Sequence, residues 1–137
     1  MSQPNTLPTL NALLNRLSHS MLQYMGEVWP WTAAADASRQ SSFMSLVDKQ
    51  RHASERLAGF LIERNSVLEL QNYPFDGSMF HYCTLDFVMP RLIEDESRLL
   101  SDLKAASHAV GADKDAARLI DQLIAEEEQT LAKLKTL

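Results

Sequence analysis

The chain has little of several residue types whose abundance marks particular classes of protein. Its 137 residues include one cysteine, four glycines and five prolines. The single Cys83 excludes a disulfide within the chain, which fits a reducing compartment or a buried thiol. Cys83 also lies in an apolar run without an identifiable base, so an inert thiol is favoured over a nucleophile. No glycine-rich phosphate loop, Cys-x-x-Cys pair or Ser-His-Asp arrangement can be assembled from this composition.

Basic residues are in the minority, with 13 Lys and Arg against 18 Asp and Glu and a net charge of -5. Without a basic stripe to displace counterions, a nucleic-acid partner is not expected. No apolar run approaches the roughly 18 to 20 residues that cross a bilayer. The N-terminal MSQPNTLPTL has neither a basic start nor an apolar run, so no export signal is expected and we expect a cytoplasmic protein.

The remaining composition is that of one globular domain. Hydrophobic residues make up 45% of the chain and charged residues 23%, and 137 residues are enough to close a core. We expect a short tail over residues 1–6 and a single domain over 7–137.

Apolar residues recur at three- and four-residue steps in four stretches, and this spacing predicts four amphipathic helices. The first covers about 7–29, the second begins within 36–42 and ends near 65, the third covers about 78–109, and the fourth begins within 113–115 and ends near 135. Pro30 ends the first run, Pro90 predicts a kink in the third helix, and Gly111 suits a C-cap after it. The fold class predicted is all-α.

The longest connection, SVLELQNYPFDGS, joins the second and third helices and is rich in turn formers. About 12 extended residues at roughly 3.3 Å each can cover some 40 Å, the length of a helical bundle. The third helix is therefore expected to start parallel to the second, after a crossover that a simple up-and-down bundle lacks.

Polar residues interrupt the apolar stripes near their centres. Burying a carboxylate is costly unless it is paired, so these positions are the natural place for a function. We expect a buried hydrogen-bonded cluster in which the amide of one member donates to a carboxylate and a tyrosine caps another. Its members are Tyr24, Gln50, Glu96, Glu127 and Thr130. If the two glutamates lie within a few ångströms of each other, one of them should stay protonated.

The second half of the chain resembles a known family. The segment over 96–134 is similar to the last two helices of ferritin-like and bacterioferritin-related proteins, with the family's glutamate at Glu96 and its EExxHL element as Glu126, Glu127, Thr130 and Leu131. LNALLNRLSHSMLQYM resembles the family's first helix, with Tyr24 at the inner tyrosine, and KQRHASERLAGFL resembles the second. The resemblance implies a ferritin-like four-helix bundle with a long crossover between helices 2 and 3.

The resemblance also implies a set of metal-ligand positions, which this chain fills only in part. Such bundles take a glutamate from each of two helices and Glu-x-x-His from each of the other two. Glu96 and Glu127 match, whereas Thr130 stands in place of a histidine and Gln50 and Ala53 replace the second Glu-x-x-His.

On the first helix the family's carboxylate falls near Leu17 or Ser18, and neither side chain supplies a charge. Two ligands of six remain. The resemblance therefore implies a degenerate di-iron site, with no metal expected or, if any is retained, iron or manganese held by Glu96 and Glu127.

The histidines do not gather at this level. His19 and His52 project outward on their helical wheels, and His108 lies near a helix end, so all three are expected in solvent. His81 faces inward about four turns before Glu96, roughly 22 Å away along the axis. Asp48, four residues before His52, is expected to form an exposed pair with that histidine and not a metal site.

The outer face of the third helix is unusually apolar. Phe80, Cys83 and Phe87 lie on the back of its buried stripe, so either the crossover or a second subunit must cover them. Closed twofold interfaces are the commonest kind, and we expect a homodimer through this face, with any other protein partner unknown.

Three functions remain open at this stage. The first is a ferritin-like domain without di-iron oxidase or iron-storage activity that acts as a structural or interaction module. The second is a metal-binding or oxidoreductase-type protein with an unorthodox carboxylate site at Glu96 and Glu127. The third is a small-molecule binder that uses the interior near Pro90. Catalytic residues are not assigned, and enzyme activity is left open.

Overall fold

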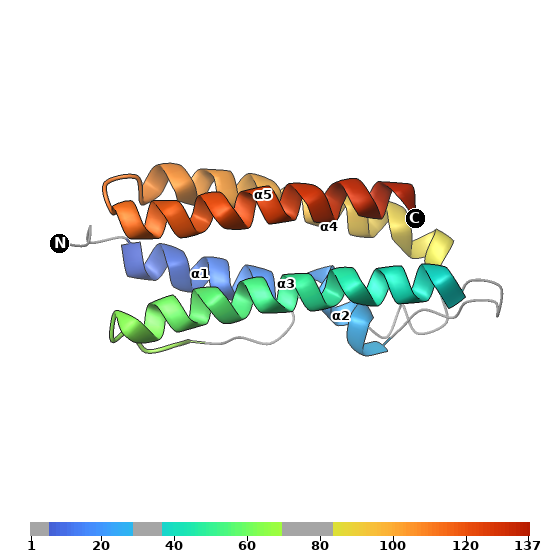
Figure 1. Cartoon of the computed structure of the whole chain (residues 1–137), viewed down its shortest axis with the longest axis horizontal. Helices are drawn as coiled ribbons and strands as arrows, with labels where there is room; N and C mark the ends of the chain where they lie inside the picture. Colours follow the sequence, from blue (N-terminus) through green and yellow to red (C-terminus); the bar gives the residue numbers. More distant parts are fainter. Residues whose placement is uncertain (1–5, 29–36, 70–83) are drawn as a thin grey trace.

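All regular elements of the described residues are helices, so the all-α prediction is confirmed. The computed structural model describes residues 6–28, 37–69 and 84–137 (Figure 1). The helices are α1 (Thr6–Ser18), α2 (Met21–Val28), α3 (Ala37–Glu63), α4 (Leu85–Ala109) and α5 (Lys114–Thr136). None of the helices in these ranges is both long and apolar enough to cross a membrane.

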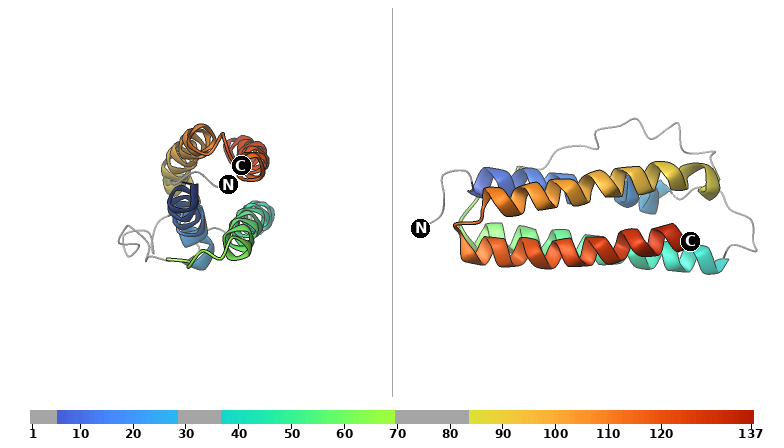
Figure 2. Two further views of the ribbon diagram at one scale, coloured as in Figure 1. Left: turned by 90° about the vertical axis from the view of Figure 1, so that its left-hand side faces the viewer. Right: turned by 90° about the horizontal axis from the view of Figure 1, so that it is seen from above.

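The helices lie side by side along a common axis (Figures 1 and 2). α1 and α2 follow one another along one edge, α1 packs against α3 and α4, and α5 packs against α3 and α4. α3 ends where α1 begins, whereas α4 begins at the opposite end of the bundle, so α3 and α4 run in the same direction. The connection between them therefore joins opposite ends of the molecule, as its length predicted.

The first predicted helix is wrong in one respect, because the structure divides it into α1 and α2 at His19 and Ser20. The amide of Gln23 donates to Ser20 Oγ at 3.2 Å, and the amide of Met21 donates to Asp95 Oδ2 at 3.0 Å. These side-chain acceptors satisfy amides that a new helix start leaves without partners. The break is thus stabilised partly by a residue 74 positions away in sequence.

Two other predicted boundaries also change. α4 begins at Leu85 and not near 78, with Thr84 as its N-cap; Thr84 Oγ1 accepts from the amide of Phe87 at 3.3 Å. At its other end the C-cap is Val110, and Gly111 has no positive φ, so the predicted glycine cap is wrong by one residue. The α5 start is confirmed, with Asp113 as N-cap accepting from the amide of Ala116 at 3.2 Å.

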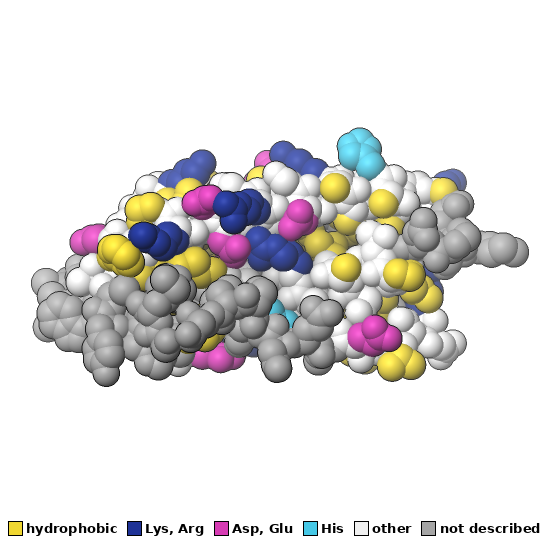
Figure 3. Space-filling model, turned by 180° about the vertical axis from the view of Figure 1, so that it is seen from behind, with side chains coloured by type: hydrophobic (Ala, Val, Ile, Leu, Met, Phe, Trp, Pro, Cys, Tyr) yellow, Lys and Arg dark blue, Asp and Glu magenta, His cyan; other side chains and the backbone are white. Residues whose placement is uncertain are grey.

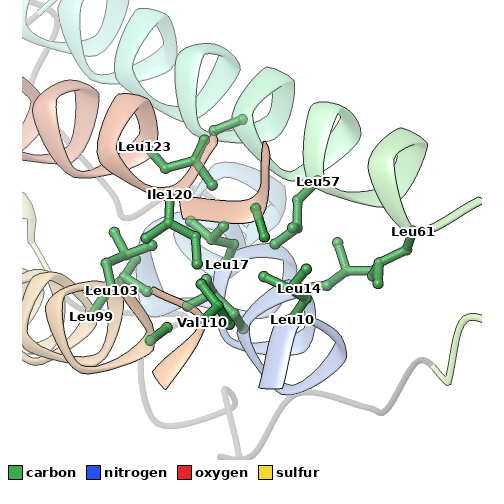
Figure 4. Close-up of a cluster of buried hydrophobic side chains, with 14 residues drawn as sticks. Leu10, Leu14, Leu17, Leu57, Leu61, Leu99, Leu103, Val110, Ile120 and Leu123 are labelled. Carbon is green, nitrogen blue, oxygen red and sulfur yellow. The ribbon is translucent and has the colours of Figure 1, made fainter. Parts of the chain in front are cut away.

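The buried apolar side chains form two clusters arranged one after the other along the bundle. The first, called the leucine cluster, contains Leu10, Leu13, Leu14, Leu17, Ala53, Leu57, Leu61, Leu99, Leu103, Ala106, Val110, Ala116, Ile120 and Leu123. Figure 4 shows side chains from α1, α3, α4 and α5 meeting in this cluster. The second, called the methionine cluster, contains Met21, Leu22, Met25, Phe43, Leu46, Val47, Leu85, Val88, Met89, Leu92 and Leu134.

Candidate functional site

A layer of buried polar side chains lies between the two apolar clusters. It comes from the α1–α2 junction, α2, α3, α4 and α5, and each member is at most 9% exposed. Its members are Ser20, Gln23, Gln50, Glu96 and Glu127, which we call the polar layer. Along α3 and α4, Gln50 and Glu96 lie between residues of the methionine cluster and residues of the leucine cluster.

Gln50 lies at the centre of the polar layer and contacts both carboxyl groups. Its Nε2 is 2.8 and 3.0 Å from the two carboxyl oxygens of Glu96, and 3.4 and 3.2 Å from those of Glu127. One amide nitrogen with two protons therefore donates to two acids that come from different helices. The predicted donation from Gln50 to a buried carboxylate is what this geometry provides.

Two donors set the orientation of the Gln50 amide. Ser20 Oγ donates to Gln50 Oε1 at 2.6 Å, and Gln23 Nε2 lies 3.2 Å from the same oxygen. Gln23 is itself held by a bond from Nε2 to the carbonyl oxygen of Val47 at 2.8 Å. Because Gln23 Nε2 can only donate, the Gln50 atom that it approaches must be the acceptor Oε1, and the Gln50 nitrogen must face the carboxyl groups.

The two carboxyl groups are expected to share a proton. Burial raises the pKa of Glu96 well above the ordinary value, and the negative charge of Glu127 and the hydrogen bond between them raise it further. Burial also raises the pKa of Glu127, although hydrogen bonds from Glu96 and Gln50 and the charge of Arg16 act in the opposite direction. The pair therefore keeps one proton where an exposed glutamate has lost its own, and deep burial together with the charge of Glu127 favours Glu96 as its holder.

A charged group closes one side of the polar layer. Arg16 Nη2 lies 3.0 Å from Asp95 Oδ1 and 2.9 Å from the Asp95 carbonyl oxygen, while Arg16 Nε lies 3.2 Å from Asp102 Oδ2. Asp95 also caps the amide of Met21 and is the neighbour of Glu96 in sequence. Asp95 thus connects α1, α2 and α4 at the depth of the buried acids.

On the face of the molecule shown in Figure 3, positive and negative side chains alternate without a large field of one sign.

The other predicted members of the cluster are placed nearby. Thr130 is 3% exposed and lies one turn after Glu127, and Ala53 is 6% exposed, one turn after Gln50. Tyr24 is half-buried and packs against the methionine cluster. The role of Tyr24 as a cap on a carboxylate stays a prediction.

At the first-helix position where the family has a carboxylate, this chain supplies no charge. Leu17 is 1% exposed within the leucine cluster, and Ser18 Oγ donates to the carbonyl oxygen of Leu14 at 2.7 Å. Ser20 reaches Gln50 instead, because the helix break turns the chain there. Sequence reasoning missed Ser20, although Ser20 and Gln23 have the Ser-x-x-Gln spacing that marks a helix start.

His52 and His108 are exposed and lie away from the polar layer. His19 directly precedes Ser20, and it is half-buried and not fully in solvent as predicted, with its Nδ1 3.2 Å from the carbonyl oxygen of Asn15. His52 is exposed, and its Nδ1 is 3.3 Å from Glu55 Oε2, whereas Asp48 pairs with Arg51. The expected Asp48–His52 pair is therefore wrong, because both side chains choose partners three residues further along the helix. His108 is exposed in the last turn of α4, and His81 lies outside the described residues.

The residues of the polar layer do not fit a di-metal centre. Across 6–28, 37–69 and 84–137, no group of three or more His, Cys, Asp or Glu is placed to hold a metal ion. An amide nitrogen has no free lone pair for a metal, and it is this atom of Gln50 that faces the two carboxyl groups. Turning the amide over would present its oxygen to the carboxyl groups, but would place its nitrogen against Gln23 Nε2, which can only donate.

The predicted dimer face is described only in part. Phe87 is 48% exposed, and the guanidinium of Arg91 lies over its ring at 4.1 Å from the centroid. Phe80 and Cys83 lie outside the described residues. The homodimer stays a prediction.

No protein-family model, curated protein or solved structure matches this chain.

Proposed function

We propose that this chain is a ferritin-like bundle that has no di-iron oxidase or iron-storage activity and acts as a structural or interaction module. The observation that supports the proposal is the orientation of Gln50. Its amide nitrogen donates to both Glu96 and Glu127, whose counterparts in the family bind metal. In this arrangement a hydrogen-bond donor takes the role that a cation would have, since both compensate buried carboxyl groups.

The helix arrangement supports the ferritin-like part of the proposal. α3 and α4 run in the same direction and are joined by a connection between opposite ends of the bundle, which is the pattern of four-helix bundles with one crossover. The buried polar residues lie at one depth and come from every helical edge of the bundle, as a ligand layer would. The chemistry of that layer differs because its centre is an amide.

Metal analysis of the purified protein tests this function. The wild-type chain is loaded anaerobically with ferrous iron or with manganese, freed of unbound metal, and analysed for metal per chain. A Gln50→Glu, Ala53→His, Thr130→His variant restores both Glu-x-x-His pairs and serves as the positive control. We expect no stoichiometric metal in the wild type and metal in the rebuilt variant.

The same experiment decides the alternative, an unorthodox metal site at Glu96 and Glu127. Stoichiometric metal in the wild type that is lost in a Glu96→Ala, Glu127→Ala variant, with the helical circular dichroism retained, would overturn the proposal in favour of that alternative. The rebuilt variant holds five of the six ligands, because the first-helix carboxylate is still absent. If it does not bind even one metal ion per chain, the layer does not superpose on a di-metal centre and the ferritin-like assignment fails.

A further inference from the structure

Among the described residues, α5 contributes unequally to the two apolar clusters. The leucine cluster receives three buried residues from α5, namely Ala116, Ile120 and Leu123, and four from α1. The methionine cluster receives only Leu134 as a buried residue from α5. α5 also buries Leu131 outside both clusters, and Leu137 packs partly buried against the methionine cluster. α5 still contributes fewer fully buried apolar side chains to the methionine cluster than to the leucine cluster, and buried apolar area is the main source of stability.

The backbone is also weaker in the half that contains the methionine cluster. In this half the edge of the bundle that α1 forms elsewhere is formed by α2, which has 8 residues. Isolated helices this short are marginally stable in water. Pro90 lies in the second turn of α4 and removes one helical hydrogen bond there. Three of the eleven buried side chains in this cluster are methionines, which pack adaptably and specify a unique arrangement weakly.

Two ion pairs between described residues, one at each end of the bundle, differ in the same direction. At the leucine end, Arg64 forms two bonds to Asp113, at 2.7 and 3.1 Å, and the Asp113 side chain is 7% exposed. At the other end, Arg39 Nη2 lies 2.9 Å from Asp86 Oδ1, and the Asp86 side chain is 81% exposed. A part-buried pair with two bonds resists opening more than a pair whose carboxylate is exposed.

The polar layer lies where these two halves meet, and the bonds within it differ in which helices they join. Ser20 and Gln23 approach Gln50 from the start of α2, while Glu96 and Glu127 approach it from α4 and α5. The helix break at His19 and Ser20 falls at the same level. Ser20 and α2 with Gln23 can therefore separate from Gln50 while the hydrogen bonds from the Gln50 amide to Glu96 and Glu127 stay intact.

We propose that the polar layer is a joint at which the methionine half of the bundle opens while the leucine half stays folded. The opening half consists of α2, the first turns of α3 and α4, and the last turn of α5. The proposal does not depend on the proposed function, because it concerns packing on either side of the layer, and native-state opening can be measured whether or not metal binds.

Amide hydrogen exchange of the full chain at low denaturant concentrations measures this opening. We expect the amides of Met25, Leu46 and Leu92 to exchange at least roughly tenfold faster than those of Leu14, Leu103 and Ile120, through an opening smaller than global unfolding. Convergence of all six amides on one exchange free energy in the absence of denaturant would overturn the proposal.

Two conservative substitutions distinguish the order of opening. Ile120→Val weakens only the leucine half, so it should speed exchange there by roughly 3- to 10-fold and leave the methionine half unchanged. Val88→Ala destabilises the native state relative to the state with the methionine half open and also relative to the globally unfolded chain. It should therefore speed exchange in both halves. If Ile120→Val speeds both halves equally, the bundle unfolds as one unit; if Val88→Ala affects only the methionine half, the leucine half opens first. Either result overturns the proposal.

Discussion

Replacing Gln50 by methionine tests the polar layer most sharply, because the two side chains have similar length and shape. Gln50→Met removes the donor that serves Glu96 and Glu127 and the acceptor that serves Ser20, while Gln23 keeps its bond to Val47. Three buried groups then lose a partner without the creation of a large cavity. The substitution therefore isolates hydrogen bonding from packing.

The expected loss follows from those three groups. A buried polar group left without its partner costs about 1–3 kcal/mol, and the Glu96–Glu127 bond limits the loss, so Gln50→Met should lower the free energy of unfolding by about 3–5 kcal/mol. That is a large fraction of the roughly 5–15 kcal/mol typical of a domain. Urea unfolding followed by circular dichroism at neutral pH measures the difference.

A second variant provides the matched comparison. Gln50→Glu keeps the acceptor for Ser20 and Gln23 but places a third carboxyl group against Glu96 and Glu127. Its stability should recover on acidification, since a protonated Glu at position 50 can donate as the amide does. A loss below about 1 kcal/mol in Gln50→Met would refute the reasoning, because it would mean that the layer does not depend on the amide.

Three further predictions follow from other contacts. The raised pKa of Glu96 means that the folded chain holds a proton that the unfolded chain releases, so stability should fall as pH rises from the ordinary carboxyl range through the raised folded pKa. Glu96→Gln should reduce that fall in urea midpoints measured between about pH 5 and pH 8, and an unchanged slope would exclude Glu96 as its source. A Cβ at Gly26 would lie 2.7 Å from Val47 Cγ1, so Gly26→Ala should lower the free energy of unfolding by about 1–3 kcal/mol. A Cβ at Gly59 would meet nothing within 4 Å, so Gly59→Ala should raise the free energy of unfolding by about 0.5–1 kcal/mol. Equal effects of the two substitutions in thermal unfolding would contradict this reasoning. If the chain dimerises through the outer face of α4, Phe87→Glu should convert the dimer into a monomer in sedimentation experiments. A wild-type chain that sediments as a monomer at all concentrations would refute the predicted homodimer.

The level of the three central polar residues could be predicted from the sequence because helical periodicity fixes which residues share a face. Gln50, Glu96 and Glu127 each lie in the middle of an apolar stripe, so three helices of similar length had to bring them to one depth. The start of α5 was also predictable, since Asp113 precedes an amphipathic run and acts as an N-cap. These features depend on local spacing.

The division between α1 and α2 could not be read from periodicity in the same way. The apolar spacing continues from Leu17 through Met21 to Met25 without a glycine or proline near the break. The interruption is stabilised by Ser20, whose hydroxyl serves both the Gln23 amide and Gln50, and by Asp95 on α4. Tertiary contacts of this kind are invisible to a helical wheel, so the role of Ser20 in the layer was missed along with the break.

The central claim is that the Gln50 amide nitrogen, and not a metal ion, compensates the two buried glutamates. Titration of the isotope-labelled protein with one equivalent of manganese, observed through the side-chain amide resonances of Gln50 and Gln23, tests it most directly, because a paramagnetic ion broadens nearby signals. The account predicts that both side-chain signals stay sharp and protected from exchange. Loss of the Gln50 signal at one equivalent, with Glu96→Ala, Glu127→Ala restoring it, would contradict the account.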